Sequence, residues 1–421
     1  MRSPGARRGL VFAVLIGVVV AGCANPGDPA APAVAPASDP LLGPADPAAG
    51  SPVRIGLFNL EDADEIDLSP VGDSAEAAAA YANAHLGGLD GHVIEVVRCA
   101  DKRDPAVAAA CGERFIREGV TAVVTGQPTS ADAILPAVVD AGIPWVGSSP
   151  LALSEVASTD AFFFGVGLIG FFAAWAQYAD DLEYRNVVIY GVDDPEVAAL
   201  VEVVGRPVFD RVGVGLRFVS VPAGVADITA QIGEGLADEP DAVLLVAERT
   251  MCQSALSALH TLGATQPKLV TPACVDRMVI DAVGESVIDK TIVFGVGDPS
   301  GDHQEAQLYR AVMRQYAPAA EPFGMTPIGY VSMLGFVRAV NAAGLPAGEQ
   351  VTGEQVGAAL RAAREVPLPL GNSGTFSCDR SQLATPLVGA TICTSEMLYT
   401  TYTGGVPGHY EKIDIAPILA G

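Results

Sequence analysis

Residues 88–126 read GLDGHVIEVVRCADKRDPAVAAACGERFIREGVTAVVTG, and this stretch decides the fold. Its apolar runs Val93–Cys99 and Ala122–Thr125 are short and rich in valine, which is typical of buried strands. Between them, Pro105–Glu118 carries apolar residues at three- and four-residue spacing, as an amphipathic helix does. Strands that are almost continuously apolar are buried on both faces. The stretch therefore predicts a strand–helix–strand unit of a parallel sheet covered by helices.

The same alternation continues on both sides of this unit. Before it, Val53–Leu60 is a predicted strand and Ser74–Leu86 an alanine-rich helix. After it, we expect a helix at Ala131–Ala141 and a strand at Pro144–Gly147. Repeated strand–helix units of this kind indicate an α/β, doubly wound lobe.

The strand–helix pattern starts again after residue 167, which indicates a second lobe of the same architecture. About 370 residues follow residue 52, more than one hydrophobic core usually serves. Predicted strands are Asn186–Tyr190, Leu216–Val221, Ala242–Ala247, Lys268–Thr271 and Thr291–Gly295. Predicted helices are Pro195–Phe209, Ile228–Leu236, Gln253–Leu262, Glu305–Tyr316, Pro327–Ala343 and Glu354–Ala363, the last opened by a Thr352–Gln355 capping box. The segments Gly374–Cys378 and Val388–Tyr399 are expected to be β structure.

The N-terminus has the pattern of a secretory signal. Arg2, Arg7 and Arg8 precede a short apolar run that ends in Val20-Ala21-Gly22-Cys23. That run is too short for a membrane span of about 20 apolar residues. A cysteine directly after the small residues resembles the lipobox of bacterial lipoproteins, in which Cys23 would be lipidated. We therefore expect a signal peptide over 1–23, with an ordinary signal peptide containing a cysteine as the alternative.

Residues 24–52 are mostly Ala, Pro, Gly, Asp and Ser, with few large apolar side chains. Such a segment buries too little surface to fold, so it is predicted to be a disordered tether. A lipid followed by a tether implies an extracytoplasmic protein that is held at a membrane by this anchor alone.

The formal charge of −25 excludes one group of partners. Nucleic acids and anionic lipid headgroups need concentrated Lys and Arg, so neither is expected to bind.

Six cysteines remain once Cys23 is assigned to the lipid, spaced as three close couples. Six thiols allow 15 pairings, and the sequence does not choose among them. An oxidising compartment favours the sequential pairs Cys99–Cys111, Cys252–Cys274 and Cys378–Cys393. A metal site is the alternative, but there is no CxxC and the five histidines are scattered, so no metal is expected.

No motif predicts catalysis or a cofactor. Gly165-Val-Gly167-Leu-Ile-Gly170 matches the GxGxxG dinucleotide pattern, but it lies between the predicted lobes rather than in the first strand–helix–strand unit. We interpret it as a closely packed, flexible crossover. GxSxG, HExxH and GK[ST] do not occur, and Asp298-Pro-Ser-Gly-Asp302 is interpreted as a turn and helix start.

Two loops at the carboxyl ends of first-lobe strands are candidate binding sites, because open α/β sheets bind ligands there. Thr125–Ser130 and Gly147–Pro150 each carry hydroxyls and backbone N–H groups suited to an anion. The alternative is that Thr129 or Ser130 is only a helix N-cap.

Together with the lipobox and the tether, residues 53–149, including the segment 88–126 and AGIPWVGSS (141–149), resemble the type I periplasmic binding proteins. The nearest branch is that of the leucine/isoleucine/valine-binding proteins, substrate receptors of ABC importers. The resemblance covers residues 53 to about 400. It implies two Rossmann-like lobes joined by a three-crossover hinge, with crossovers near Gly165–Gly167, Gly295–Asp298 and Gly371–Thr375. The N-lobe would then comprise 53–166 and 298–372, and the C-lobe 167–297 and 373–421.

The resemblance also implies where ligand contacts lie. Ser130, with Thr129 beside it, and Ser149 with Pro150 match positions that hold the ligand's carboxylate and ammonium groups. Acidic partners for an ammonium are missing, since Ala273 and Cys274 stand at one such place and Val166 and Leu168 at another. Glu248 is the remaining candidate, and the acidic loop 61–67 is a second source of charge. The expected contacts are Gln127, Thr129, Ser130, Ser149, Pro150 and Glu248.

A buried ammonium without partners is costly. We therefore expect the cleft to bind an apolar carboxylate or a small polar molecule without an amine, rather than a branched-chain amino acid. The expected function is that of a monomeric, lipid-anchored solute-binding protein without enzymatic activity or cofactor, which delivers its ligand to an ABC permease. The alternatives are a sensory or structural binding lipoprotein and an extracytoplasmic enzyme on the same scaffold.

Overall fold

A computed structural model of the chain describes residues 39–63, 67–346, 350–383 and 388–419. The chain from Asp39 to Gly421 forms one compact unit. The expected signal peptide, Cys23 and the first part of the expected tether lie outside the described residues. No helix in the part that the structure describes is long and apolar enough to cross a membrane.

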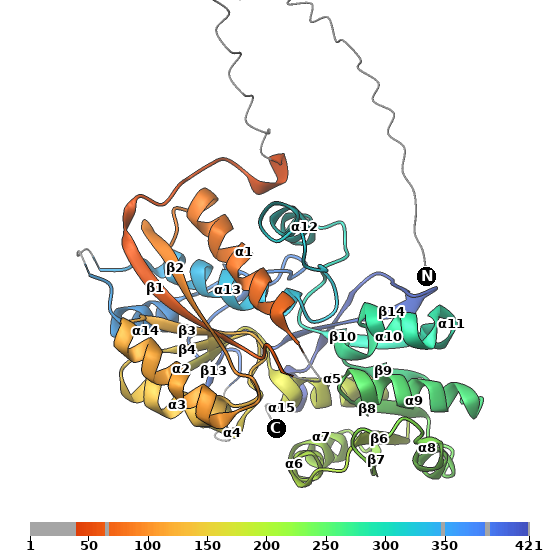
Figure 1. The fold of residues 1–421 in the computed structure, drawn as a ribbon. Coiled ribbons are helices and arrows are strands. Elements are labelled where there is room, and N and C mark those ends of the chain that lie inside the picture. Colours follow the sequence, from red (N-terminus) through yellow and green to blue (C-terminus); the bar gives the residue numbers. More distant parts are fainter. Residues whose placement is uncertain (1–38, 64–66, 347–349, 384–387, 420–421) are drawn as a thin grey trace, which may run out of the picture. The chain divides into compact units, whose positions relative to one another are not determined.

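The first large sheet is entirely parallel and belongs to the N-lobe (Figure 1). Its strand order is β13-β5-β4-β3-β1-β2. The strands are β1 (Gly50–Asn59), β2 (His92–Ala100), β3 (Ala122–Thr125), β4 (Trp145–Gly147), β5 (Ala161–Phe163) and β13 (Thr391–Ile392). The order reverses between β1 and β3, as in doubly wound folds, where ligands bind beyond the carboxyl ends of the strands.

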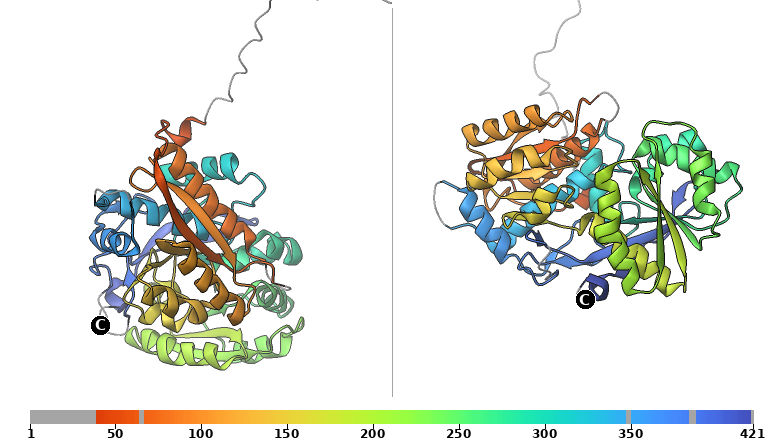
Figure 2. Two further views of the ribbon diagram at one scale, coloured as in Figure 1. Left: turned by 60° about the vertical axis from the view of Figure 1, so that its left-hand side comes forward. Right: turned by 90° about the horizontal axis from the view of Figure 1, so that it is seen from below.

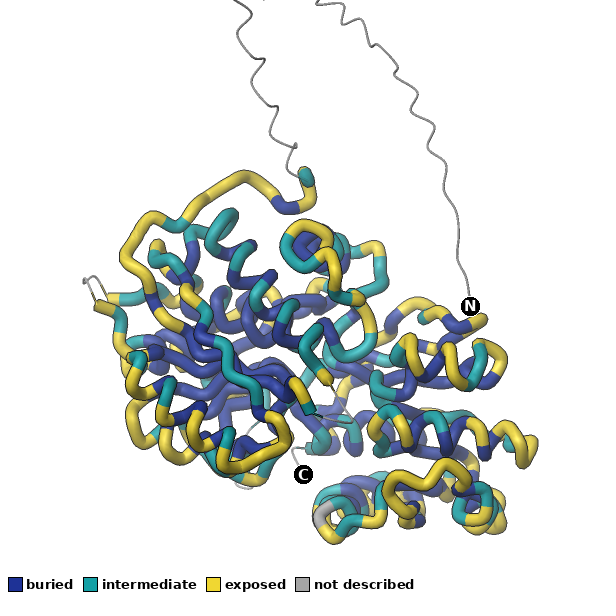
Figure 3. The backbone as a smooth tube through the Cα atoms, in the orientation of Figure 1, coloured by how far each residue is buried: buried dark blue, intermediate teal, exposed yellow. Residues whose placement is uncertain are grey.

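Helices cover both faces of this sheet (Figures 1 and 2). Neighbouring residues of one strand pack into opposite clusters: Val124 lies in the core that contains α1 and α13, and Val123 in the core that contains α2 and α3. The strands are therefore buried on both sides, as their apolar runs predict (Figure 3). The helices are α1 (Ser69–His85), α2 (Pro105–Glu118), α3 (Ala131–Asp140), α4 (Leu153–Ala157), α12 (Gln304–Tyr316), α13 (Pro327–Ala343) and α14 (Gly353–Ala362).

The second large sheet belongs to the C-lobe and repeats this order as β7-β6-β8-β9-β10. Its parallel strands are β6 (Asn186–Val192), β7 (Gly215–Val221), β8 (Ala242–Val246), β9 (Lys268–Val270) and β10 (Thr291–Gly295). The chain's C-terminal strands β14 (Glu396–Thr403), β15 (Val406–Pro407) and β16 (Glu411–Asp414) extend the sheet antiparallel beyond β10. The two sheets confirm the predicted fold class of two doubly wound α/β lobes.

Helices again lie on both faces of the second sheet. Leu244 packs with α5 and α7, and its neighbour Leu245 packs with α8 and α9. The elements are α5 (Gly167–Asp181), α6 (Pro195–Leu200), a π-helical turn (Val201–Gly205), α7 (Arg206–Arg211), α8 (Thr229–Leu236), α9 (Arg249–Thr261), the 3₁₀ helix η3 (Pro272–Val275), α10 (Arg277–Val283), α11 (Glu285–Ile288) and α15 (Ala416–Leu419). The predicted helix Pro195–Phe209 is thus interrupted by the π turn.

The described chain crosses between the two sheets after β5, after β10 and after β13. The first two crossings lie where they were expected. The third was expected at Gly371–Thr375, but β13 pairs in parallel with β5 of the first sheet, with Thr391 opposite Phe162. The described residues 373–383 and 388–392 therefore belong to the N-lobe, and the chain enters the second sheet only between Ile392 and Glu396. A two-residue strand leaves no periodic pattern, so the prediction placed the crossing too early.

The glycines of the GxGxxG match serve the packing of the first crossing. A Cβ on Gly165 would lie 2.8 Å from Val296 Cγ1 and 2.9 Å from the Ser148 carbonyl oxygen. Gly167 has a φ of +65°, and a Cβ there would meet the Pro150 carbonyl oxygen at 2.6 Å. Side chains are therefore excluded sterically, which supports the interpretation of a closely packed crossover.

The end of the expected tether is folded. The 3₁₀ helix η1 (Pro40–Leu42) inserts Leu42 into the N-lobe core, where 2% of this residue is exposed. Backbone N–H groups of Asp46 and Ala48 donate to the carbonyls of Ala84 and Asn83. Residues 39–52 are thus part of the lobe, and the prediction of disorder over 24–52 is wrong for them. Burial of Leu42 and the two backbone hydrogen bonds hold this segment on the lobe although it has few apolar side chains.

The structure joins the cysteines in the sequential pairs. Cys99–Cys111 links β2 to α2, and Cys252–Cys274 links α9 to η3. Cys378–Cys393 links the segment after β12 (Thr375–Phe376) to the third crossing. Each disulfide therefore has one cysteine at, or a few residues after, the end of a strand.

Leu42 and its exposed neighbour Leu41 provide a matched test of the folded N-terminal segment. Leu42→Ala is expected to lower the free energy of unfolding by about 2–3 kcal/mol, because it empties a buried site. Leu41 is 43% exposed, so Leu41→Ala is expected to lower the free energy of unfolding by less than about 0.5 kcal/mol. Urea denaturation measures both, and equal effects would contradict the packing of η1 on the lobe.

Candidate functional site

The loop after β3 is held by a buried carboxylate of the protein itself. Asp101, which is fully buried after β2, accepts hydrogen bonds at Oδ2 from the backbone N–H groups of Thr129 and Ser130 and from the Thr129 hydroxyl. The Gln127 backbone N–H donates to Asn59 Oδ1 at 3.0 Å. The backbone amides of 129 and 130, expected to hold a ligand's carboxylate, are thus already bonded to Asp101.

Ser130 occupies the N-cap position of α3. It precedes α3, but its side chain makes no capping hydrogen bond, and only 9% of the residue is exposed. Among the described residues, its hydroxyl forms no hydrogen bond to a histidine, the pairing that an esterase-like site would require. Ser130 is therefore an N-cap by position, but its hydroxyl does not make the capping bond.

Ser149 and Pro150 lie against the first two crossings. Ser149 Oγ is 3.2 Å, and Val296 Cγ1 2.8 Å, from the position where Gly165 would carry a Cβ. Ser149 is half-buried and Pro150 is buried. The loop after β4 therefore packs where the lobes are joined.

Glu248 faces its own helix. The residue is exposed at the end of β8, and its two carboxylate oxygens accept from the backbone N–H groups of Thr250 and Met251 at 2.7 Å each. This is the N-cap of α9, which Asp and Asn occupy more often. The next residue, Arg249, contacts Asp276 at 3.5 Å.

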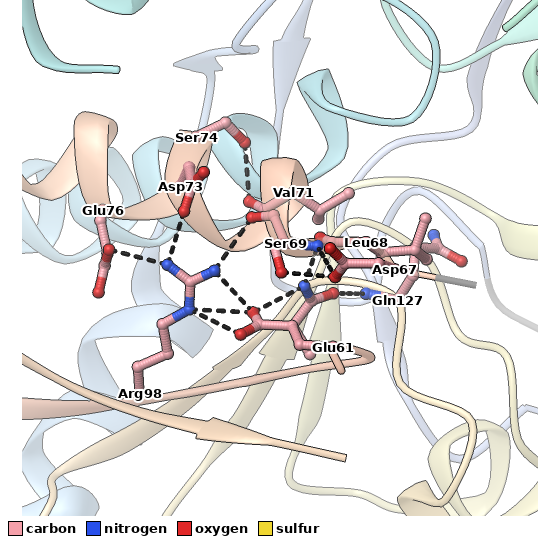
Figure 4. Close-up of polar contacts among 11 residues, drawn as sticks. Glu61, Asp67, Leu68, Ser69, Val71, Asp73, Ser74, Glu76, Arg98 and Gln127 are labelled. Carbon is pink, nitrogen blue, oxygen red and sulfur yellow. Dashed lines mark hydrogen bonds and ion pairs between the residues drawn. The ribbon is translucent and has the colours of Figure 1, made fainter. Parts of the chain in front are cut away.

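The acidic loop after β1 is tied down by Arg98 (Figure 4). Glu61 contacts the Arg98 guanidinium at 2.9 Å, and Asp73 and Glu76 contact it at 2.8 and 3.0 Å. Although burial opposes it, hydrogen bonding to Glu61 and Asp73 raises the pKa of Arg98, so the side chain stays charged. Part of the loop, residues 64–66, lies outside the described residues. The described carboxylate Glu61 therefore serves the structure of the N-lobe.

A cavity of about 890 Å³ lies at the second crossing and is lined from both lobes. The N-lobe supplies Leu370 and residues between Glu321 and Val331. The C-lobe supplies η3, α10, the end of β10 and residues Tyr402 and Gly405–Tyr410 from the C-terminal strands. The crossing itself contributes Val296–His303. None of the six expected contact residues lines this cavity.

The cavity walls are mostly apolar. Val275, Ile280 and Val293 come from the C-lobe, and Val331 and Leu370 face them from the N-lobe. Such walls suit the apolar body of a small molecule, whose orientation a few polar groups would fix.

The polar groups of the second crossing form a turn. Asp298, which is 2% exposed, accepts from the backbone N–H groups of Ser300 and Gly301 at 3.0 and 2.8 Å. His303 lies 3.4 Å from the same carboxylate and caps α12. The predicted turn and helix start at Asp298–Asp302 is confirmed, and the segment also lines the cavity. The turn was predictable from the local sequence, whereas its place in the cavity wall depends on the fold.

Two buried tyrosines line the C-terminal side of the cavity. Tyr402 and Tyr410 are each 8% exposed. Burial raises the pKa of Tyr402 to about 12, and burial together with Tyr402 and Asp298 raises that of Tyr410. Both phenols are therefore neutral at physiological pH and are able to donate or accept a hydrogen bond.

A family model described as periplasmic binding protein matches residues 62–392. The chain belongs to this family. No curated protein sequence matches the chain. The matched segment starts after β1 and ends before β14. It contains the other strands of the N-lobe sheet, the first two crossings and the parallel strands of the C-lobe.

Solved structures share the fold at low sequence identity. The leucine binding protein LivK from Thermotoga maritima is 17% identical, with a TM-score of 0.69 over 86% of this chain and 99% of that one. A fatty acid ABC transporter substrate-binding protein from Thermomonospora curvata is 15% identical, with a TM-score of 0.70 over 88% and 95%. A solute binding protein from R. palustris in complex with 4-hydroxybenzoate is 16% identical, with a TM-score of 0.67 over 88% and 99%. The fold is thus that of type I periplasmic binding proteins, and these relatives are named for unlike ligands.

Asp101 offers a test of the loop after β3. Asp101→Asn is expected to lower the free energy of unfolding by about 2 kcal/mol, because it weakens charge-assisted bonds to Thr129 and Ser130. Asp104→Asn is the matched control, since asparagine caps a helix as well as aspartate does and Asp104 caps α2. Urea denaturation measures the free energy of unfolding of both variants. Equal stabilities would show that Asp101 does not hold the loop.

Proposed function

We propose that this chain is the solute-binding receptor of an ABC-type importer, and that it captures a small molecule between its lobes. The observation that carries the proposal is the cavity of about 890 Å³ lined from both lobes. This volume lies in the range of small-molecule sites, about 300–1,000 Å³. Membership of the periplasmic binding protein family implies an extracytoplasmic location. The lipid anchor at Cys23, the permease partner and the monomeric state are parts of the proposal.

Capture would work by closure of the lobes over the solute. A solute that contacts both lobes binds the closed arrangement more tightly than the open one and shifts the population toward it. The cavity lies beside the crossings, where Val296 packs against Gly165. At its edge, the N-lobe approaches the C-lobe closely, because a Cβ on Gly324 would lie 2.9 Å from Asp276 Oδ2. The closed form is what a membrane permease would recognise.

We also propose that branched-chain amino acids are not tight ligands. An α-amino acid needs partners for both of its charges. The backbone amides of residues 129 and 130 already bond to Asp101, and Glu248 already caps α9. Ser130 and Ser149 do not line the cavity in the present arrangement, and they stay proposed contacts of the closed form through their hydroxyls. The apolar walls support the expectation of a ligand with an apolar body.

A thermal-shift screen of small carboxylates, amines, amino acids and polyols tests the function. At least one compound should raise the melting temperature, because a ligand that binds only the folded protein stabilises it by mass action. Leucine, isoleucine and valine are expected to leave the melting temperature unchanged. X-ray scattering with the best compound should show a smaller radius of gyration than without it.

Calorimetric titration with leucine could contradict the proposed ligand preference. Sub-micromolar affinity for leucine would overturn the proposed exclusion of branched-chain amino acids. A structure in which the cavity is blocked and no solute stabilises the protein would favour the alternative of a structural lipoprotein. Neighbouring genes for a permease and an ATPase would favour import over sensing.

A further inference from the structure

We infer that the interlobe cavity selects an organic cation, an ammonium group carried on an apolar body, and that the C-terminal strands set this preference. The inference rests on the proposed function and names its class of solute. It reverses the charge expected from the sequence, where the N-lobe loops indicated an anion.

The wall that sets the preference is outside the segment shared with the family. The family match ends at residue 392, whereas Tyr402 and Gly405–Tyr410 line the cavity. The family model therefore does not describe this part of the wall.

Two phenol groups of this wall lack a partner in the protein. Tyr402 and Tyr410 are more than nine-tenths buried and line the cavity. Within the described residues, neither hydroxyl has a hydrogen-bond partner, in contrast to Tyr399 on the same strand, which donates to Glu411. Neither hydroxyl oxygen is among the buried polar atoms without a partner, so both are accessible from the cavity, where the N–H of a solute can donate to them.

The charge balance at the cavity is negative. Asp302 and Glu321 line it, are exposed, and form no ion pair within the part of the chain that the structure describes. The lining cation Arg277 is paired with Asp281 at 2.9 Å, and Asp298 is held by its own turn. With the histidines counted as neutral, two carboxylates remain unbalanced. They attract a cation and repel a carboxylate.

The aromatic rings add to this preference. Phe323 from the N-lobe and Tyr402 and Tyr410 from the C-lobe line the cavity. Aromatic faces attract ammonium groups, most strongly when the ammonium is partly desolvated. The apolar part of the solute would lie on Ile280, Val331 and Leu370. Each end of the molecule would thus contact residues of both lobes.

Four compounds of one size test the charge preference. Phenethylammonium, 2-phenylethanol, 3-phenylpropanoate and phenylalanine share a phenyl group and differ in charge. Calorimetry at low ionic strength should rank phenethylammonium first, with the anion and the zwitterion at least about tenfold weaker because their carboxylates meet Asp302 and Glu321. Raising the salt concentration should weaken phenethylammonium and leave 2-phenylethanol unchanged.

Substitutions of lining residues test which side chains favour the cation. Glu321→Gln should weaken phenethylammonium about threefold, since one exposed carboxylate contributes modestly, while the matched control Glu354→Gln on α14 should not change it. Tyr410→Phe should weaken it about fivefold by removing the hydroxyl of a lining residue, and Tyr399→Phe should not. Val406→Trp, at a lining residue that is 61% exposed, should block all probes without unfolding the protein.

The outcomes separate this inference from the proposed function. Stronger binding of 3-phenylpropanoate than of phenethylammonium overturns the inference, as does unchanged binding in both Glu321→Gln and Tyr410→Phe. If phenethylammonium fails to bind at millimolar concentration, the inference is also overturned. In each of these three cases the proposed function survives if another compound of the screen binds and Val406→Trp abolishes its binding. The proposed function fails if no compound of the screen binds.

Discussion

The structure depends on one steric constraint, the close approach of chain segments where the lobes are joined. At Gly165, Val296 of the second crossing and the Ser148 carbonyl leave no room for a Cβ. The third crossing joins them, because the Cys393 backbone N–H donates to the Phe163 carbonyl at 2.7 Å. Segments that are far apart in sequence therefore meet at one place, and any change in the angle between the lobes has to occur there.

This constraint explains why the cavity lies where it does. Val296 packs against Gly165 on one side and lines the cavity on the other. The apolar core also continues through the junction, since one cluster contains Phe163 of the N-lobe and Phe172 of the C-lobe. A shared core favours a small reorientation of two linked bodies over full separation. A solute beside such a junction contacts both lobes with little movement, which is what the proposed capture requires.

The fold followed from the sequence where the pattern is local and periodic. Pro105–Glu118, Ala122–Thr125, Thr291–Gly295 and Pro327–Ala343 have the bounds that apolar spacing predicts. The two-residue strand β13 carries no such pattern, and only its pairing with β5 places it in the N-lobe. Leu42 looked like part of a tether because its burial depends on contacts with the distant helix α12.

The candidate site was less predictable, because its polar groups are used by partners distant in sequence. Nothing local to Ser130 indicates that Asp101 bonds to its backbone, and Glu248 gave no sign that it caps α9 rather than facing a ligand. Tyr410 lies beyond the family match, so resemblance could not assign it a role. Charged groups and hydroxyls can be counted from a sequence. Which of them lack a hydrogen-bond or ion-pair partner can be seen only in the folded structure.

A crystal structure of the protein purified without unfolding, so that any bound solute is retained, tests the central claim most directly. The account predicts a solute in the cavity beside Val296, touching Leu370 or Val331 from one lobe and Ile280 or Tyr410 from the other. A solute that touches one lobe alone, or that binds elsewhere while this cavity holds only water, would contradict it.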